Sequence, residues 1–228
     1  MGLGSTAGRT VGRKLAPRAT HNFVREAMEK AIAGVGPLRP VSRTAAKKLA
    51  DAHGDVEKAA HAVIRSHVAY ASAQGFVTNI GGLMTAIAAI PANLAGLTLV
   101  QVRMVAAIAH VHGHDLDDPK VRAAVVATLL GEESVKKAVK KGKLPARPLA
   151  LATGTDLEPA LEHALSIEIS SELLARMAGK RIATTAGKRI PVLGGVVGMT
   201  ADGFATWQLG RFAAREFAGA NVKTARQR

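Results

Sequence analysis

The sequence predicts an all-α protein, a compact multi-helix domain built around apolar, Gly- and Ala-rich helical hairpins. Of the 228 residues, 48% are hydrophobic but only 3% are aromatic. Such small side chains suit closely approaching helices better than a strand-rich core. Helix start and stop signals also recur along the whole chain, and no segment shows the alternation of a strand.

The predicted helices follow from apolar periodicity and from the positions of Gly and Pro. They span residues 21–34, 43–53, 55–74, 76–90, 92–112, 119–130, 132–141, 157–179 and 191–218. Asp118 before Pro119 predicts an N-cap, because its carboxylate can accept from the unpaired backbone N–H groups of the first turn. Thr155 and Glu158 have the spacing of a capping box. Gly113 is expected to end the preceding helix in the left-handed conformation.

The domain organisation is expected to be simple. Residues 1–20 are basic and rich in Gly, without the apolar core of a secretory signal, and predict a disordered tail. Residues 21–218 then form a single helical domain, and residues 219–228 a basic C-terminal tail. The stretch 140–155 combines prolines with a run of lysines, which makes it the best candidate for an internal linker.

Positive charge is concentrated near the N-terminus. The net charge is +14, and residues 1–50 hold 10 Lys and Arg against 2 Asp and Glu. Such a distribution suits anionic lipid headgroups, at about 1 kcal/mol for each cation held near the surface. Nucleic-acid binding is not expected, because no aromatic residues interleave with the basic ones and no recognition motif is present. The absence of cysteine permits a reducing, cytoplasmic location.

One long stretch of the chain carries no charge. Residues 66–102 contain no Asp, Glu, Lys or Arg, and Pro91 should break them into two helical arms. Three interpretations are open: a hairpin buried in the core, a hairpin that opens to enter a bilayer or enclose a lipid, and a fixed transmembrane span. The span is the least favoured, because Asn79, Asn93 and Gln101 interrupt the apolar run.

A second apolar segment, residues 190–210, repeats this composition with a single acid, Asp202. We expect the two segments together to present an apolar site to lipid or another apolar ligand. The candidate contact residues are Phe76, Leu83, Met84, Pro91, Leu97, Met104, Val197 and Phe204.

Arg103 is the lone charged residue between Arg65 and Asp115. A guanidinium on so apolar a helix must reach the surface or find a partner. Asp202 is the natural acid, so an Arg103–Asp202 pair is one hypothesis. Such a pair would act as a structural latch, or Arg103 would serve a phosphate or carboxylate headgroup at the mouth of an apolar site.

No motif predicts catalysis, and no metal or cofactor is expected. The chain lacks the nucleophile elbow, the zinc-protease helix motif and any carboxylate pair placed for acid–base chemistry. One turn is rich in potential metal ligands, but neighbouring positions two apart face different ways on a helix and Asp118 already has a capping role. These ligands are His110, His112, His114, Asp115, Asp117 and Asp118.

Three segments resemble the EcsC family of bacterial proteins: GFVTNIGGLMTAIAAIPANL, QVRMVAAIAHVHGHDLDDPKVR and IPVLGGVVGMTADGF. They correspond to a Gly-Phe entry with a Gly-Gly pair and a Pro-Ala step, an Arg-containing helix closed by Gly and an acidic turn, and a late Pro-Gly-Gly helix. The resemblance spans roughly residues 55–217. Many members carry Asp where this chain has Asn93, so any role of a carboxylate there is in doubt.

The resemblance implies an α-helical, intracellular protein without cofactor or known enzymatic activity, located in the cytoplasm or peripherally at the inner face of the cell membrane. Two functions are expected from it and from the apolar segments. The first is a non-catalytic, lipid-binding or peripheral membrane protein. The alternative is a soluble adaptor of a membrane transport or envelope system, with a membrane transporter as its partner and the apolar hairpins serving only as core.

Overall fold

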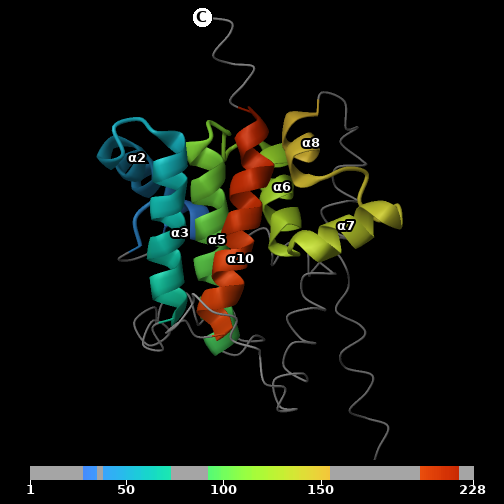
Figure 1. Ribbon diagram of the computed structural model, residues 1–228, viewed down its shortest axis with the longest axis horizontal. Coiled ribbons are helices and arrows are strands. Elements are labelled where there is room, and N and C mark those ends of the chain that lie inside the picture. The colour runs from blue at the N-terminus through green and yellow to red at the C-terminus, as the bar shows by residue number, and fades with distance from the viewer. Residues whose placement is uncertain (1–27, 35–37, 73–91, 155–200, 221–228) are drawn as a thin grey trace, which may run out of the picture.

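The computed structural model describes residues 28–34, 38–72, 92–154 and 201–220, with only the backbone of residues 92–96, 201 and 220 (Figure 1). Within these residues there is no strand, and the all-α class is confirmed. A short helix spans residues 28–33. The further helices are α2 (Val41–Asp51), α3 (Val56–Ser72), α5 (Ala92–Val111), α6 (Pro119–Leu129), α7 (Glu132–Lys140), α8 (Pro148–Thr153) and α10 (Ala201–Phe217), followed by a 3₁₀ turn, η4 (Ala218–Ala220).

Helix α5 lies at the centre of the bundle. Helices α2, α3, α6 and α10 all pack against it. Each residue from Met104 to Ala109 is at most 2% exposed. A helix that is apolar on every side is stable only when other elements surround it. The second arm of the charge-free stretch is therefore a core helix of this protein.

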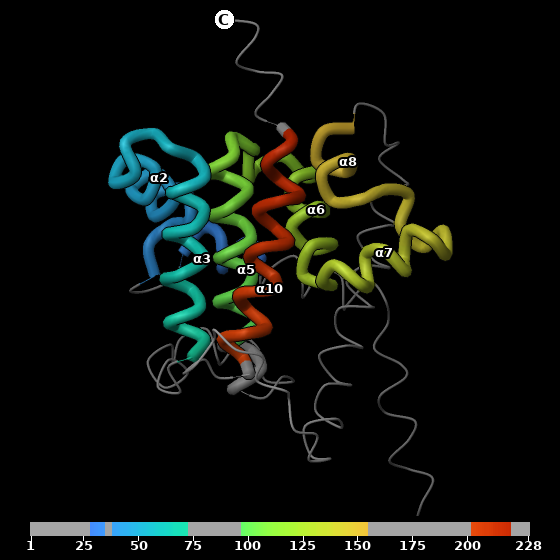
Figure 2. The backbone as a smooth tube through the Cα atoms, viewed as in Figure 1, coloured from blue at the N-terminus to red at the C-terminus, as the bar shows by residue number. Residues whose placement is uncertain are grey.

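The direction of the helices gathers particular ends of the chain. Helix α3 runs antiparallel to both α5 and α10, as the colour gradient along the tube shows (Figure 2). The last turn of α3 and the first turns of α5 and α10 therefore meet at one end, the lower end of the bundle in Figure 1. At the opposite end, the His114 ring contacts Phe217 edge to face, with ring centroids 5.1 Å apart.

The turn between α5 and α6 is built as the sequence predicts. Gly113 has φ 87°, and backbone N–H groups of Gly113 and His114 donate to the carbonyls of His110 and Ala109. This is the hydrogen-bond pattern of a Schellman cap, which needs a residue in the left-handed conformation. The Asp118 carboxylate then accepts from the Lys120 N–H at 2.8 Å and caps α6.

The predicted linker 140–155 contains a helix that the sequence analysis missed. Pro148 begins α8, and Pro148, Leu151 and Ala152 are buried where this helix packs against α6. Proline at the first helical position has no N–H to leave unpaired, and the apolar residues three and four positions on face the same side. The stretch is therefore partly a packed element of the bundle.

Two ion pairs attach the C-terminal half of α10 to the segment that precedes α8. The Arg147 Nε lies 3.0 Å from Glu216 Oε1, and Arg215 pairs with Glu132. Glu216 is buried, with 4% of its surface exposed. A buried carboxylate needs such a partner, because its desolvation is costly.

Several predictions lie outside the described residues. They concern the helices 76–90 and 157–179, the N-terminal part of helix 191–218, the capping box of Thr155 and Glu158, and the tail 1–20. Of the predicted C-terminal tail, residues 219–220 belong to η4.

Candidate functional site

The predicted apolar site is partly covered by the described residues. Leu97, Met104 and Phe204 have described side chains. The other predicted members lie outside the description: Phe76, Leu83, Met84, Pro91 and Val197.

Met104 lies in the core, with 0% of its surface exposed. A Cβ added at Gly210 of α10 would lie 3.1 Å from the Met104 Sδ and 2.9 Å from Ile64 Cγ1 of α3. The missing side chain at Gly210 therefore lets α10 approach α3 and α5 closely. Met104 is a packing residue between these helices, which differs from its predicted role as a ligand contact.

Leu97 and Phe204 have a different environment. Both are half-buried, and both belong to the first turns of their helices, α5 and α10, at the lower end of the bundle. The Phe204 ring stacks on Trp207 with centroids 5.9 Å apart and an interplanar angle of 25°. These two predicted residues thus lie where an external apolar partner could reach them.

Arg103 is buried, with 8% of its surface exposed. Its Nη2 donates to the backbone carbonyl of Arg39 at 2.6 Å, and its Nη1 donates to the carbonyl of Ala31. Ala31 is in the last turn of helix 28–33, where carbonyls lack partners within the helix. Burial lowers the pKa of Arg103 from its ordinary value. The guanidinium fastens the N-terminal segment to α5.

Asp202 does not share this environment. It is exposed in the first turn of α10, and none of the ion pairs between described residues joins it to Arg103. The predicted pair is therefore corrected: Arg103 neither reaches the surface nor meets Asp202, because two backbone carbonyls satisfy it inside the bundle.

The histidines of the α5–α6 turn are placed by packing. His112 and His114 are buried, and the Nε2 of His114 lies 3.2 Å from the carbonyl of Phe217. Neither ring nitrogen of His112 has a hydrogen-bond partner among the described residues. Burial lowers the pKa of both rings. In the described part of the chain, no three His, Asp or Glu side chains converge as metal ligands.

A cluster that the sequence analysis missed lies on α10. Trp207, the only tryptophan of the chain, is 37% exposed, and the Arg211 Cζ lies 5.6 Å from the centroid of its ring. Together with Phe204 these residues are spaced by three and four positions, which places them on one face of a helix. That spacing around a lone tryptophan was the available signal.

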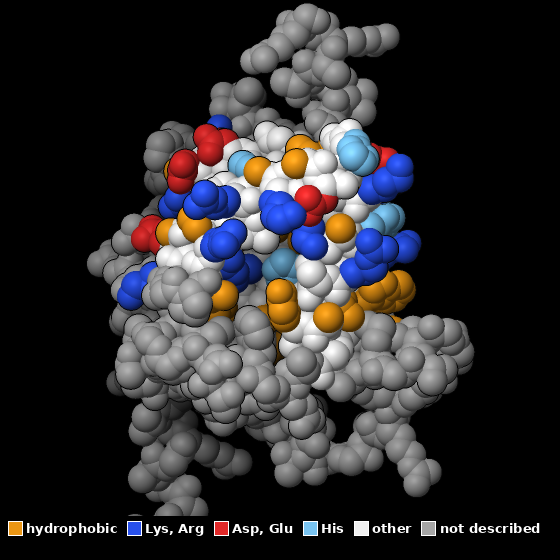
Figure 3. Space-filling model, turned by 90° about the vertical axis from the view of Figure 1, so that its left-hand side faces the viewer, with side chains coloured by type: hydrophobic (Ala, Val, Ile, Leu, Met, Phe, Trp, Pro, Cys, Tyr) orange, Lys and Arg blue, Asp and Glu red, His pale blue; other side chains and the backbone are white. Residues whose placement is uncertain are grey.

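Basic side chains cover the face formed by α2 and α3. Figure 3 shows lysines and arginines across the middle of this face, acidic side chains in its upper half, and apolar side chains along its lower edge. Arg43 and Arg65 are exposed there. Between described residues, neither of them forms an ion pair.

None of the described helices combines the length and the apolar character that crossing a membrane requires. The charge-free stretch is described only from Ala92 onward. The described arm, α5, packs on four helices.

Comparison with known proteins gives one match. No curated protein and no solved structure matches the chain. The model of the EcsC protein family matches residues 9–218, which extends beyond the segments that carry the resemblance and begins inside the predicted tail. The chain therefore belongs to the EcsC protein family.

Proposed function

We propose that this EcsC protein is non-catalytic and binds peripherally to anionic membrane surfaces, at the cytoplasmic face of the cell membrane, where it presents an apolar helical site to lipid. The observation that carries the proposal is the layered surface of Figure 3, in which basic side chains lie between an acidic upper part and an apolar lower edge. Peripheral membrane binding combines these two attractions, electrostatic and apolar.

The charge of the whole chain supports an anionic partner. Its net charge is +14, and the exposed Arg43 and Arg65 add to the basic face in the described part. Long-range attraction of this kind raises the local concentration of the protein at a negative surface and weakens as salt is added.

A second candidate function is that of a soluble adaptor of a membrane transport or envelope system, with a membrane transporter as its partner. The burial of α5 on all sides favours it, because this half of the charge-free stretch already has a protein partner. In an adaptor the apolar hairpins serve only as core, and the protein binds no lipid vesicle.

Vesicle co-sedimentation separates the two functions. The full chain is incubated with phosphatidylcholine vesicles that contain or lack phosphatidylglycerol, at low and at physiological salt. We expect binding to the anionic vesicles only, and weaker binding at the higher salt. Failure to bind anionic vesicles at either salt concentration would refute the membrane function and favour the adaptor.

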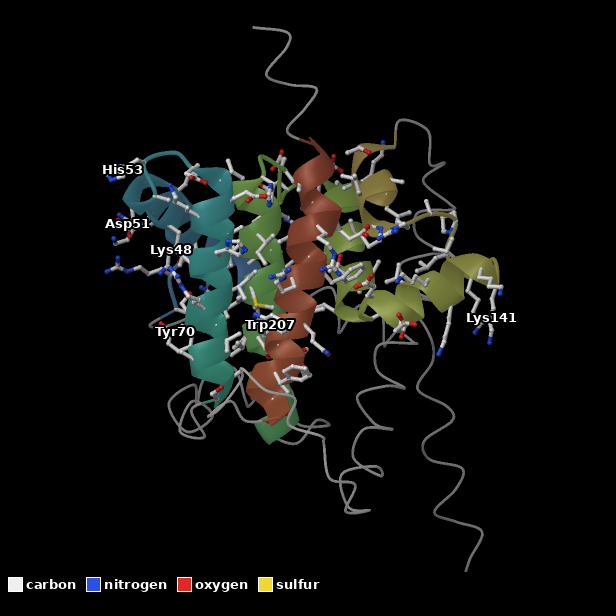
Figure 4. All side chains as sticks on the ribbon, viewed as in Figure 1. Lys48, Asp51, His53, Tyr70, Lys141 and Trp207 are labelled. Carbon is white, nitrogen blue, oxygen red and sulfur yellow. The ribbon has the colours of Figure 1, made fainter. Side chains whose placement is uncertain are left out.

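A pair of double variants tests whether the basic face is responsible. Replacing Arg43 and Arg65 with Gln should weaken binding to anionic vesicles by about thirtyfold, at about 1 kcal/mol for each lost cation. The matched control replaces Lys140 and Lys141 with Gln at the end of α7, far from α2 and α3 (Figure 4). Equal losses in the two double variants would contradict a binding role of this particular face.

A further inference from the structure

Two large apolar side chains stand out from the described surface. Tyr70 on α3 is 49% exposed and Trp207 on α10 is 37% exposed, and both lie toward the lower end of the bundle (Figure 4). Tyrosine and tryptophan are enriched at membrane–water interfaces, since each combines an apolar ring with a polar group.

The charge-free stretch connects to this same end. It leaves the described bundle at Ser72, the last residue of α3, and returns at Ala92, the first residue of α5. Residues 73–91 contain no Asp, Glu, Lys or Arg. The most apolar part of the chain is thus attached at the end that exposes the two aromatic rings.

Each aromatic residue has an arginine on its own helix, farther from the lower end. Arg211 follows Trp207 by four residues, and Arg65 precedes Tyr70 by five. At about 1.5 Å of rise for each residue, both arginines lie about 6 to 8 Å deeper along the bundle. Both are exposed. This order, an aromatic ring and then a cation about one turn away, matches the order of acyl chains and phosphates in a bilayer.

The acid nearest to this site faces elsewhere. Asp202 precedes Trp207 by five residues, which places it about 140° around the axis of α10. Arg211, in contrast, lies over the Trp207 ring. The Trp207 face of α10 therefore offers an aromatic surface and a positive charge without an adjoining carboxylate from its own helix.

Building on the proposed membrane function, we infer that the lower end of the bundle is the membrane-contacting surface and that its partner is an anionic bilayer. Trp207, Phe204 and Tyr70 enter the interface, while Arg211 and Arg65 bind lipid phosphates. The upper end, with the α5–α6 turn and η4, faces away from the membrane.

Fluorescence tests the inference directly, because the chain contains one tryptophan. Emission of Trp207 is recorded as anionic vesicles are added, with lipids brominated either near the glycerol or near the methyl end of the acyl chain. We expect a shift of the emission to shorter wavelength and stronger quenching by the shallow bromines. Arg211→Gln should weaken binding about fivefold, the equivalent of about 1 kcal/mol.

The outcomes distinguish this inference from the function on which it rests. Co-sedimentation with unchanged, unquenched emission of Trp207 would overturn the orientation and leave membrane binding intact. Absence of co-sedimentation would overturn both. Lys141→Gln on α7 is the matched control for Arg211→Gln, and an equal loss in the two variants would count against a phosphate contact at Arg211.

Discussion

The Nη2 of Arg103 lies 2.6 Å from the backbone carbonyl oxygen of Arg39, a residue 64 positions earlier in the chain. The same guanidinium donates to the carbonyl of Ala31. One buried side chain of α5 therefore holds both sides of the connection between helix 28–33 and α2.

Replacing Arg103 should destabilise the protein without affecting vesicle binding of the folded form. Arg103→Met leaves two carbonyls without their donor, and we expect a loss of about 2 to 4 kcal/mol in the free energy of unfolding. Denaturant titration measures the loss, and hydrogen exchange should show faster exchange in residues 28–34. Unchanged stability together with weakened vesicle binding would instead assign Arg103 to a headgroup.

His67 should make stability depend on pH. Burial lowers its pKa to about 4 from an ordinary value of 6.5, while its Nδ1 lies 2.8 Å from the carbonyl of Val63. Arg103 and Lys48 add positive charge nearby. Between these two pKa values the unfolded chain binds a proton that the folded chain excludes, so the stability present above pH 6.5 is lost as the pH falls toward 4.

The size of this effect can be measured by substitution. From pH 7 to pH 5, His67 should account for a fall of about 2 kcal/mol in the free energy of unfolding. Denaturant titration of the parent protein and of His67→Gln at both pH values isolates this part, because His112 and His114 remain in each. Identical pH dependence in the two proteins would show that His67 is not the group responsible.

Gly210 should resist enlargement. In Gly210→Ala the new methyl group would approach Ile64 and Met104 to within about 3 Å, closer than ordinary contact, and we expect a net loss of about 1 to 2 kcal/mol despite the higher helix propensity of alanine. Ile64→Ala opens space at this contact. The double variant should therefore lose less stability than the sum of the single variants, and strict additivity would exclude the contact.

The Arg147–Glu216 pair should show the asymmetry of a half-buried ion pair. The Arg147 side chain is 54% exposed and the Glu216 side chain 4%. Arg147→Ala leaves a buried carboxylate without its cation, for which we expect a loss of about 2 kcal/mol. Adding Glu216→Gln to Arg147→Ala removes that charge and should recover part of the loss in thermal unfolding. A further decrease in the double variant would contradict this account.

Local chemistry made most helices predictable. Asp118 and Gly113 mark a start and a stop because each acts on its own neighbouring backbone groups, within the sequence that carries the signal. Helix α8 was missed since the prolines and lysines around it suggested a connection. Pro148, which occupies a first helical position much as Pro119 does, was the signal that it would continue as a helix.

The partner of Arg103 was harder to predict. The sequence identified a lone charge on an apolar helix, but carbonyl oxygens occur at every residue and carry no side-chain signature. Which of them a guanidinium reaches depends on how distant segments pack. Asp202 was chosen from its composition alone, and the antiparallel arrangement of helices exposes it in the first turn of α10.

The contact of His114 with Phe217 spans 103 residues of sequence. At translation rates of about 5 to 20 residues per second, α5 is complete some 5 to 20 s before the end of α10 has been synthesised. Until then the nascent chain lacks the helix that covers Ile64 and Met104. A ribosome-bound intermediate with this uncovered groove is a natural substrate for chaperones, and its lifetime is set by elongation rather than by the folding rate of the bundle.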